Sequence, residues 1–297
     1  VWSVAVSRDG QTVVSGSVDK TIRVWDIKSP GGGTCTKTLT GHSSHVCSVA
    51  ISRDGQTVVS GSGDNTIKVW DVSSESCTKT LTGHSNDVRS VAVCRDGQTV
   101  VSGSDDKTIK VWDLAKGTCT KTLTGHSHRV HSVAVSRDGQ TVVSGSWDKT
   151  IKVWDLASGT CTKTLTGHSR NVSSVAVSRD GQTVVSGSGD KTIKVWDVKS
   201  PGGGTCTKTI TGHSGEVCSV AVSRDGQTVV SGSNDKTIKV WDVSTGTCTK
   251  TLTGHSQGMG SVAVSRDGQT VVSGSDDNTV RVWRRQKRRP TAANGGG

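Results

Sequence analysis

Apolar and polar residues alternate along this chain in short runs. Residues 46–51 alternate in this way, residues 57–62 combine two Val with small polar residues, and each run ends at a turn-forming segment. Alternation with a period of two predicts half-buried β-strands, and Arg-Asp-Gly-Gln and Asp-Asn predict tight turns. Two further strands are predicted at 66–71 and 77–82, before a Gly-His pair. The stretch 43–84 thus predicts four antiparallel strands, which we name a, b, c and d in chain order.

The same pattern recurs along the whole chain. Arg-Asp-Gly-Gln occurs seven times, at spacings of 42 residues, or of 45 where Ser-Pro-Gly-Gly-Gly lengthens a loop. Its aspartates are Asp9, Asp54, Asp96, Asp138, Asp180, Asp225 and Asp267. A repeat of this length with four strands is typical of the blades of a β-propeller. Counted in this way, the chain holds seven a, seven b and seven c strands but six d strands.

Six Gly-His pairs and six Trp-Asp pairs stand at equivalent places in the repeats. With these signatures, residues 1–283 resemble the WD40 family, with repeats near 1–42, 43–84, 85–126, 127–168, 169–213, 214–255 and 256–283. The resemblance implies an all-β, seven-bladed propeller with four antiparallel strands per blade. Because the last d strand is missing, we expect a three-stranded seventh blade with an exposed edge, cut from a longer protein. We expect residues 284–297 to be a basic, disordered tail.

Each full repeat contains His, Ser, Asp and Trp at fixed spacing. A Ser-His-Asp set is typical of hydrolases, but a catalytic triad needs one nucleophile exposed at a cleft, and this set occurs six times. The WD40 resemblance implies instead a buried structural network, exemplified by His84, Ser102, Asp106 and Trp112. The chain shows no phosphate-binding loop, zinc-ligand spacing or pair of catalytic carboxylates. We therefore expect no enzymatic activity, no cofactor and no metal site.

The repeats differ at four positions: the two residues after Gly-His-Ser, the second residue of strand a, and the residue before the b–c turn aspartate. In a four-stranded blade the d–a and b–c connections share one end, so these positions converge on one face around the central channel, which we name the variable face. A position that accepts Trp, Arg, His and Gly is not packed in a core. We predict a binding face at Trp2, His45, Cys47, Asp87, Arg89, Asp105, His128, Arg129, His131, Trp147, Arg170, Asn171, Glu216, Asn234 and Asp276. Neutral drift of exposed loops is the alternative, but it leaves the constancy of the exposed a–b turn unexplained.

Charge narrows the expected ligand. The formal net charge is +11, and five of these charges lie in the tail, so the disc is only mildly basic. On the variable face, repeats 3 to 5 carry most of the basic residues, whereas repeats 6 and 7 lean acidic. Trp and Arg are enriched at binding hot spots. We predict a protein or peptide ligand of acidic character anchored on Trp147, with Trp2 half a turn away in a separate patch.

The near-identity of the repeats is similar to that of the amplified WD arrays of STAND-class signalling ATPases. This resemblance implies the sensor domain of a larger protein, with the ATPase module before Val1. The alternatives are nucleic-acid binding through the basic tail, which we regard as less expected, and a structural or designed scaffold without a ligand.

Nine cysteines are present, and six of them occupy one equivalent place in strand d: Cys35, Cys77, Cys119, Cys161, Cys206 and Cys248. Because these six lie in separate repeats, we expect buried, unpaired thiols that behave as small hydrophobic residues. So many free thiols are typical of a reducing compartment. We expect an intracellular, cytoplasmic and monomeric domain that does not associate with membranes.

Overall fold

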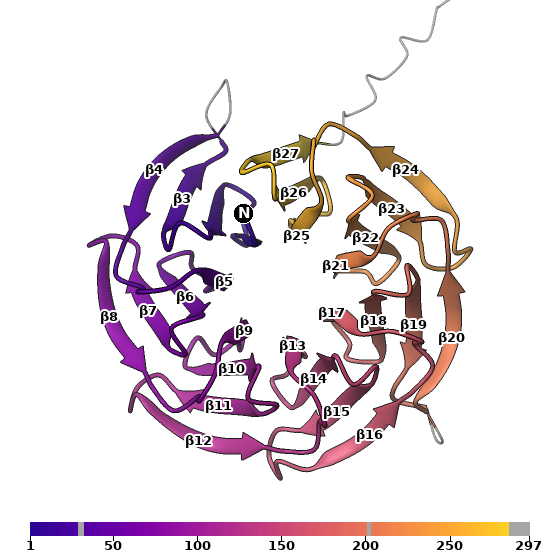
Figure 1. Ribbon diagram of the computed structural model, residues 1–297, viewed down its shortest axis with the longest axis horizontal. Helices are drawn as coiled ribbons and strands as arrows, with labels where there is room; N and C mark the ends of the chain where they lie inside the picture. Colours follow the sequence, from indigo (N-terminus) through magenta and orange to yellow (C-terminus); the bar gives the residue numbers. More distant parts are fainter. Residues whose placement is uncertain (29–32, 201–202, 285–297) are drawn as a thin grey trace, which may run out of the picture.

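The computed structural model describes residues 1–28, 33–200 and 203–284, which form a ring of seven β-sheets around a central channel (Figure 1). Six sheets have four antiparallel strands and the seventh, counted over the described residues, has three. The predicted seven-bladed propeller is confirmed. Among the described residues, no helix has the length and apolar character needed to cross a membrane.

The strands occupy equivalent places in every blade. Strands a, which lie innermost (Figure 1), are β1 (Ser3–Val6), β5 (Val46–Ile51), β9 (Val88–Val93), β13 (Val130–Val135), β17 (Val172–Val177), β21 (Val217–Val222) and β25 (Met259–Val264). Strands b are β2 (Thr12–Gly16), β6 (Thr57–Ser62), β10 (Thr99–Ser104), β14 (Thr141–Ser146), β18 (Thr183–Ser188), β22 (Thr228–Ser233) and β26 (Thr270–Ser275). Strands c are β3 (Ile22–Asp26), β7 (Ile67–Asp71), β11 (Ile109–Asp113), β15 (Ile151–Asp155), β19 (Ile193–Asp197), β23 (Ile238–Asp242) and β27 (Val280–Arg284). Strands d are β4 (Thr34–Leu39), β8 (Ser76–Leu81), β12 (Thr118–Leu123), β16 (Cys161–Leu165), β20 (Thr205–Ile210) and β24 (Cys248–Leu252).

The core lies between blades rather than inside any one of them. In strand b of the third blade, Val100 packs toward the second blade and its neighbour Val101 packs toward the fourth. Both side chains are fully buried, because successive residues of a strand point to opposite faces of the sheet and both faces are covered. This explains how a chain without Phe or Tyr builds its core chiefly from Val, Ile, Leu and Trp, as clusters between neighbouring blades.

Strand b also carries a glycine at the closest approach of two blades. A Cβ atom added to Gly103 would lie 2.7 Å from Cγ1 of Val130 in the next blade, well inside van der Waals contact. The equivalent glycines of the other six blades are equally close to their neighbours. Glycine is constant at this place because no side chain fits between the sheets.

The first and seventh blades are joined by the same contact that joins the other neighbours. The backbone N–H of Val49 donates to Ser3 Oγ at 3.0 Å, and the N–H of Val4 donates to Ser261 Oγ at 3.2 Å across the seam. The amino group of Val1 donates to the carbonyl of Ser275 at 2.8 Å. Arg284 belongs to β27, whereas the rest of the predicted tail, 285–297, lies outside the described residues.

The prediction of buried thiols is wrong for the six equivalent cysteines. All six are free but exposed: Cys35, Cys77, Cys119, Cys161, Cys206 and Cys248. Strand d is the outermost strand of its blade, and in β8 the side chains of Ser76, Cys77 and Thr78 are exposed. Cys77 therefore rests against its own strand, with Sγ 3.3 Å from the carbonyl of Lys79.

Candidate binding face

The variable positions of the two connecting loops are held together by a backbone hydrogen bond. The N–H of Trp147, before the b–c turn aspartate, donates to the carbonyl of Arg129 in the d–a loop at 3.1 Å. Asp105 donates in the same way to Asp87, and Asn234 to Glu216, each at 2.9 Å. The second to seventh blades all contain this bond. The two loops therefore present their variable side chains next to one another.

The variable residue of strand a lies at a β-bulge. In the pairing of β5 with β6, Val46 opposes Ser62 and Ser48 opposes Gly61, so Cys47 has no partner. The described register shifts at the same place in the third to seventh blades. A bulge leaves its extra residue unpaired and re-aims its side chain. This explains why Arg89, His131 and Gly260 replace Cys47 without disturbing the sheet.

A buried hydrogen-bond network supports the two loops from below. His84 Nδ1 donates to Asp106 Oδ2 at 2.7 Å, Ser102 Oγ donates to His84 Nε2 at 2.7 Å, and Trp112 Nε1 donates to Ser102 Oγ at 2.8 Å. Asp106 also accepts the N–H of Ser85 at 3.2 Å. Five further blades repeat the set, and the first has only the Trp25–Ser15 bond. Ser102 is fully buried between its partners, so it is not placed to attack a substrate.

Burial and hydrogen bonding set the charges in this network. Burial lowers the pKa of His42, because it penalises the charged imidazolium, and hydrogen bonding to Asp64 offsets only part of this effect. For Asp64, burial raises the pKa, but hydrogen bonds from Thr66 and His42 outweigh it and bring the value to about 2. In the second blade the network therefore joins a neutral His42 to an ionised Asp64 at neutral pH.

The arginines of the third and fourth blades are paired with aspartates. Arg89 Nη2 lies 2.9 Å from Asp87 Oδ2 and 2.8 Å from Asp105 Oδ2. Arg129 Nη1 lies 3.4 Å from the same oxygen of Asp105. Two positive and two negative charges thus meet at this part of the variable face. A ligand that binds here must either preserve these ion pairs or replace them.

Trp147 is held in place and remains open to solvent. Its side chain is 40% exposed, and Arg129 Cζ lies 4.4 Å from the ring centroid, within cation–π range. The rings of His128 and His131 stack on it, with centroids at 5.8 and 6.1 Å. Burial lowers the pKa of His131, whose Nδ1 donates to the carbonyl of Ser173, so this ring is neutral. The indole therefore offers a rigid apolar surface beside one cation.

The other predicted residues form separate local contacts around the ring. Trp2 meets the His45 ring edge-on, with centroids 4.7 Å apart, and has no ring contact with Trp147. Arg170 pairs with Glu216 at 3.3 Å, and Asn171 Nδ2 donates to Ser173 Oγ at 3.0 Å. Cys218 Sγ lies 3.1 Å from Asn234 Oδ1. The backbone N–H of Asp276 donates to the carbonyl of Gly258 at 3.0 Å.

One group on this face has donors spaced for a metal ion. Ligand atoms of His45, Cys47 and Asp87 all lie within 4.8 Å of one another. Burial raises the pKa of the Cys47 thiol to about 12, and Arg89 already neutralises Asp87. A metal binds the thiolate rather than the thiol. This group is consequently a poor metal site.

Two features of the molecule were not among the predicted site residues. Val18 is 54% exposed and stands at the same place in the first blade as Trp147 does in the fourth. Its sequence signal was available, because it replaces Gly, Asp or Asn at a variable position. The second feature is a pocket lined by the arginines of the Arg-Asp-Gly-Gln turns, on the face opposite the variable face. Only the closed ring brings these arginines together.

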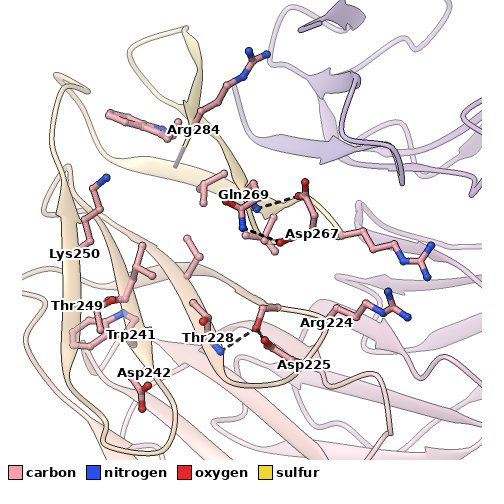
Figure 2. A pocket seen from close by; sticks show the side chains of 18 of the residues that line it. Arg224, Asp225, Thr228, Trp241, Asp242, Thr249, Lys250, Asp267, Gln269 and Arg284 are labelled. Carbon is pink, nitrogen blue, oxygen red and sulfur yellow. Dashed lines mark hydrogen bonds between the residues drawn. The ribbon is translucent and has the colours of Figure 1, made fainter. Parts of the chain in front are cut away.

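A further pocket lies between β22–β24 and β25–β27, with Trp241 and Lys250 on one side and Gln269 and Arg284 on the other (Figure 2). Its volume is about 800 Å³. In other blade pairs, the c–d connection packs here, as Gly159 does against Leu123. In the seventh blade the residues that follow Arg284 lie outside the described part of the chain. This pocket is therefore not a candidate site.

A ring of seven blades, six of which contain the His-Ser-Asp-Trp network over the described residues, defines a WD-repeat propeller. The family described as WD domain, G-beta repeat, matches residues 1–26, 33–71, 75–113, 117–155, 159–197, 204–242 and 246–284. The chain belongs to this WD40 family, whose propellers are generally scaffolds for protein interactions.

Two curated relatives match over single repeats. Cell division control protein 4 of Saccharomyces cerevisiae is 48% identical over 46 residues, which are 16% of this chain and 5% of that protein. Nuclear distribution protein PAC1 of Mycosarcoma maydis is 55% identical over 42 residues, 14% of this chain and 9% of that protein. The matched region thus spans less than a tenth of either relative.

Proposed function

We propose that this domain is a non-enzymatic recognition module that binds a protein or peptide through the variable face. One observation carries the proposal. Among the described residues, the large apolar side chains that are exposed are Val18 and Trp147, and both precede the aspartate of a b–c turn. Exposed aromatic side chains beside arginine are typical of binding hot spots. Sequence variation and apolar exposure thus coincide on one face.

The preferred ligand is acidic and meets Trp147 together with Arg129 and Arg170. Arg170 is the most exposed of the three arginines on this face that form ion pairs, with 59% of its side chain accessible. An acidic group can replace the partly exposed Glu216 as its partner. Because Arg89 is held by two aspartates, it contributes to the shape of the face rather than to charge recognition.

The wider role that we propose is the sensor domain of a STAND-type signalling protein, acting as a monomeric domain in the cytoplasm. The near-identity of the seven repeats and the free thiols support this role. A coding sequence before Val1 that contains a phosphate-binding loop would agree with it, and one without any nucleotide-binding motif would contradict it.

The binding proposal is tested with peptides selected on the full chain from a random display library. Trp147→Ala is expected to lower the affinity for the selected peptides by about 30-fold, equivalent to about 2 kcal/mol of binding free energy, because it removes a hot-spot side chain. Isothermal titration calorimetry measures the change. Gln140→Ala, in the exposed a–b turn of the same blade, is the matched control and is expected to leave affinity unchanged. Peptides that bind both variants as tightly as the parent chain would overturn the proposal.

A further inference from the structure

The central channel opens on the face opposite the variable face into a pocket of about 420 Å³. The innermost strands of all seven blades surround this channel (Figure 1). The a–b turn of each blade contributes an arginine to the pocket, and together they are Arg8, Arg53, Arg95, Arg137, Arg179, Arg224 and Arg266. A motif that is ordinary in one repeat thus becomes a ring of seven guanidinium groups.

These arginines have no carboxylate partner, although an aspartate follows each of them. In the second blade, Asp54 Oδ1 accepts hydrogen bonds from Ser52 Oγ at 2.5 Å and from the N–H of Gln56 at 3.0 Å. The aspartate is thereby used in closing the turn. Within the part of the chain that the structure describes, no ion pair involves any of the seven arginines, and no Asp or Glu lines the pocket.

The seven charges act on one another. The pKa values of Arg8, Arg179 and Arg266 lie below the ordinary value because of partial desolvation and because of repulsion by other arginines of the ring. All remain protonated at neutral pH, since a guanidinium does not lose its proton in proteins. The ring therefore creates a focused positive potential at the channel mouth, which attracts multivalent anions.

We infer that this pocket binds a compact anion that carries several phosphate groups. Arginine recognises phosphate through two parallel hydrogen bonds, and a ring of arginines presents such donors from every side. The volume is that of a small-molecule site. Beneath the arginines, apolar walls are provided by Val6, Ile51, Val93, Val135, Val177 and Val222, and the other polar side chains of the lining are the hydroxyls of Ser52, Ser178 and Ser223. The site is independent of the variable face and of its ligand.

The test uses inositol hexakisphosphate as the soluble probe and the full chain as the receptor. Calorimetry is expected to show one probe bound per chain. A triple variant removes the three half-buried arginines: Arg137→Gln, Arg179→Gln, Arg266→Gln. It is expected to weaken binding about tenfold or more, because each substitution removes charge-assisted hydrogen bonds to the phosphates. If this variant does not fold, Arg8→Gln, Arg53→Gln, Arg224→Gln replaces three exposed members.

The matched control removes three positive charges from the other face: Lys107→Asn, Lys149→Asn, Lys191→Asn. These exposed lysines occupy left-handed turn positions, where the second and seventh repeats already carry Asn65 and Asn278. Asparagine accepts this conformation readily. The control is therefore expected to fold and to bind the probe with unchanged affinity.

Three further probes complete the test. Vesicles with phosphatidylinositol bisphosphate, bound by the parent chain and not by the arginine variant, would support the site and identify a lipid headgroup as the source of the phosphates. Binding of the soluble probe alone would support a free metabolite. The inference is overturned if hexakisphosphate does not bind, or if the arginine variant and the lysine control lose the same affinity for it. It is also overturned if inorganic phosphate binds as tightly as hexakisphosphate. Tighter, arginine-dependent binding of a single-stranded oligonucleotide would overturn it in favour of a nucleic acid.

Discussion

At the scale of single residues, the molecule separates positions that hold the fold from positions that are free to differ. Ser102 is surrounded by His84 and Trp112 and is the same in every repeat, whereas Trp147 projects from a b–c loop and is replaced by Val, Gly, Asp or Asn in the other six repeats. The sequence was sufficient to predict both groups, because seven copies of one repeat act as an internal comparison. It was not sufficient to show that Arg89 is held by two aspartates, since the second of them, Asp105, is 16 residues away and only the fold brings it beside Arg89 and Asp87.

The network residue Ser102 gives a stability prediction with an internal control. Ser102→Ala leaves the buried indole N–H of Trp112 without an acceptor and His84 Nε2 without a donor. We expect the free energy of unfolding to fall by about 2–4 kcal/mol, because unsatisfied buried polar groups are costly. Urea denaturation followed by tryptophan fluorescence measures this loss.

Ser15→Ala in the first blade is the matched control for Ser102→Ala. Ser15 has no histidine partner, and Trp25, which donates to it, is only half-buried. We expect a loss of about 1 kcal/mol or less for this change. Equal losses in the two variants would contradict the role assigned to the histidine network.

At the scale of strands and blades, periodicity predicted most of the architecture. Residues 46–51 and 57–62 were predicted as strands and are β5 and β6, and the third predicted strand begins one residue later, at Ile67. Periodicity could not give the exposure of strand d, because alternation is the same whether or not a further sheet covers the strand. The buried-cysteine prediction failed for this reason.

The stability of the ring depends on the glycine that lies at each interface between two blades. A Cβ at Gly187 would lie 2.6 Å from Cγ1 of Val217, on the buried strand a of the next blade. Gly187→Ala is expected to destabilise the chain by about 1–3 kcal/mol, because overpacking forces the two sheets apart. The midpoint and slope of urea denaturation provide the measurement.

The control lies two residues away. A Cβ at Gly189 would meet only the end of the Asn171 side chain, and the sixth repeat carries Asn234 at this place. Although Gly189 is buried, the end of one side chain can move aside more easily than a neighbouring sheet, so Gly189→Asn is expected to cost less than about 1 kcal/mol. If Gly187→Ala were as harmless as this control, the account of blade packing would be wrong.

At the scale of the whole molecule, ring symmetry turns repetition into sites that no single repeat contains. Seven Arg-Asp-Gly-Gln turns become one polycationic pocket, and the variable positions become one face around the opposite mouth of the channel. The sequence showed that these exposed turns do not vary, but it gave no reason to expect their arginines in one pocket. Their convergence depends on the closure of the ring, which alternation along the chain does not specify.

The pH dependence of stability is a property of the network as a whole. Burial lowers the pKa values of His42, His168 and His213 below the ordinary value of 6.5, so the unfolded chain binds protons more readily than the folded chain. The contribution of these histidines to the free energy of unfolding is complete above pH 6.5, and it is lost as the pH falls through their pKa values in the folded chain. The contribution of Asp64 to the free energy of unfolding is complete above pH 3.8, and it is lost as the pH falls toward the folded-state pKa of about 2. Thermal unfolding is thus expected at lower temperature at pH 5 than at pH 7, and a higher midpoint at pH 5 would contradict this assignment.

The most direct test of the binding account is hydrogen–deuterium exchange of the full chain with and without a peptide selected on it. Binding to the variable face predicts protection of residues 127–131 and 146–148 and of equivalent loops in the adjacent blades. The a–b turn at 136–141 should exchange at the same rate in both states. Protection confined to the a–b turns, with the d–a and b–c loops unchanged, would contradict the assignment of recognition to the variable face.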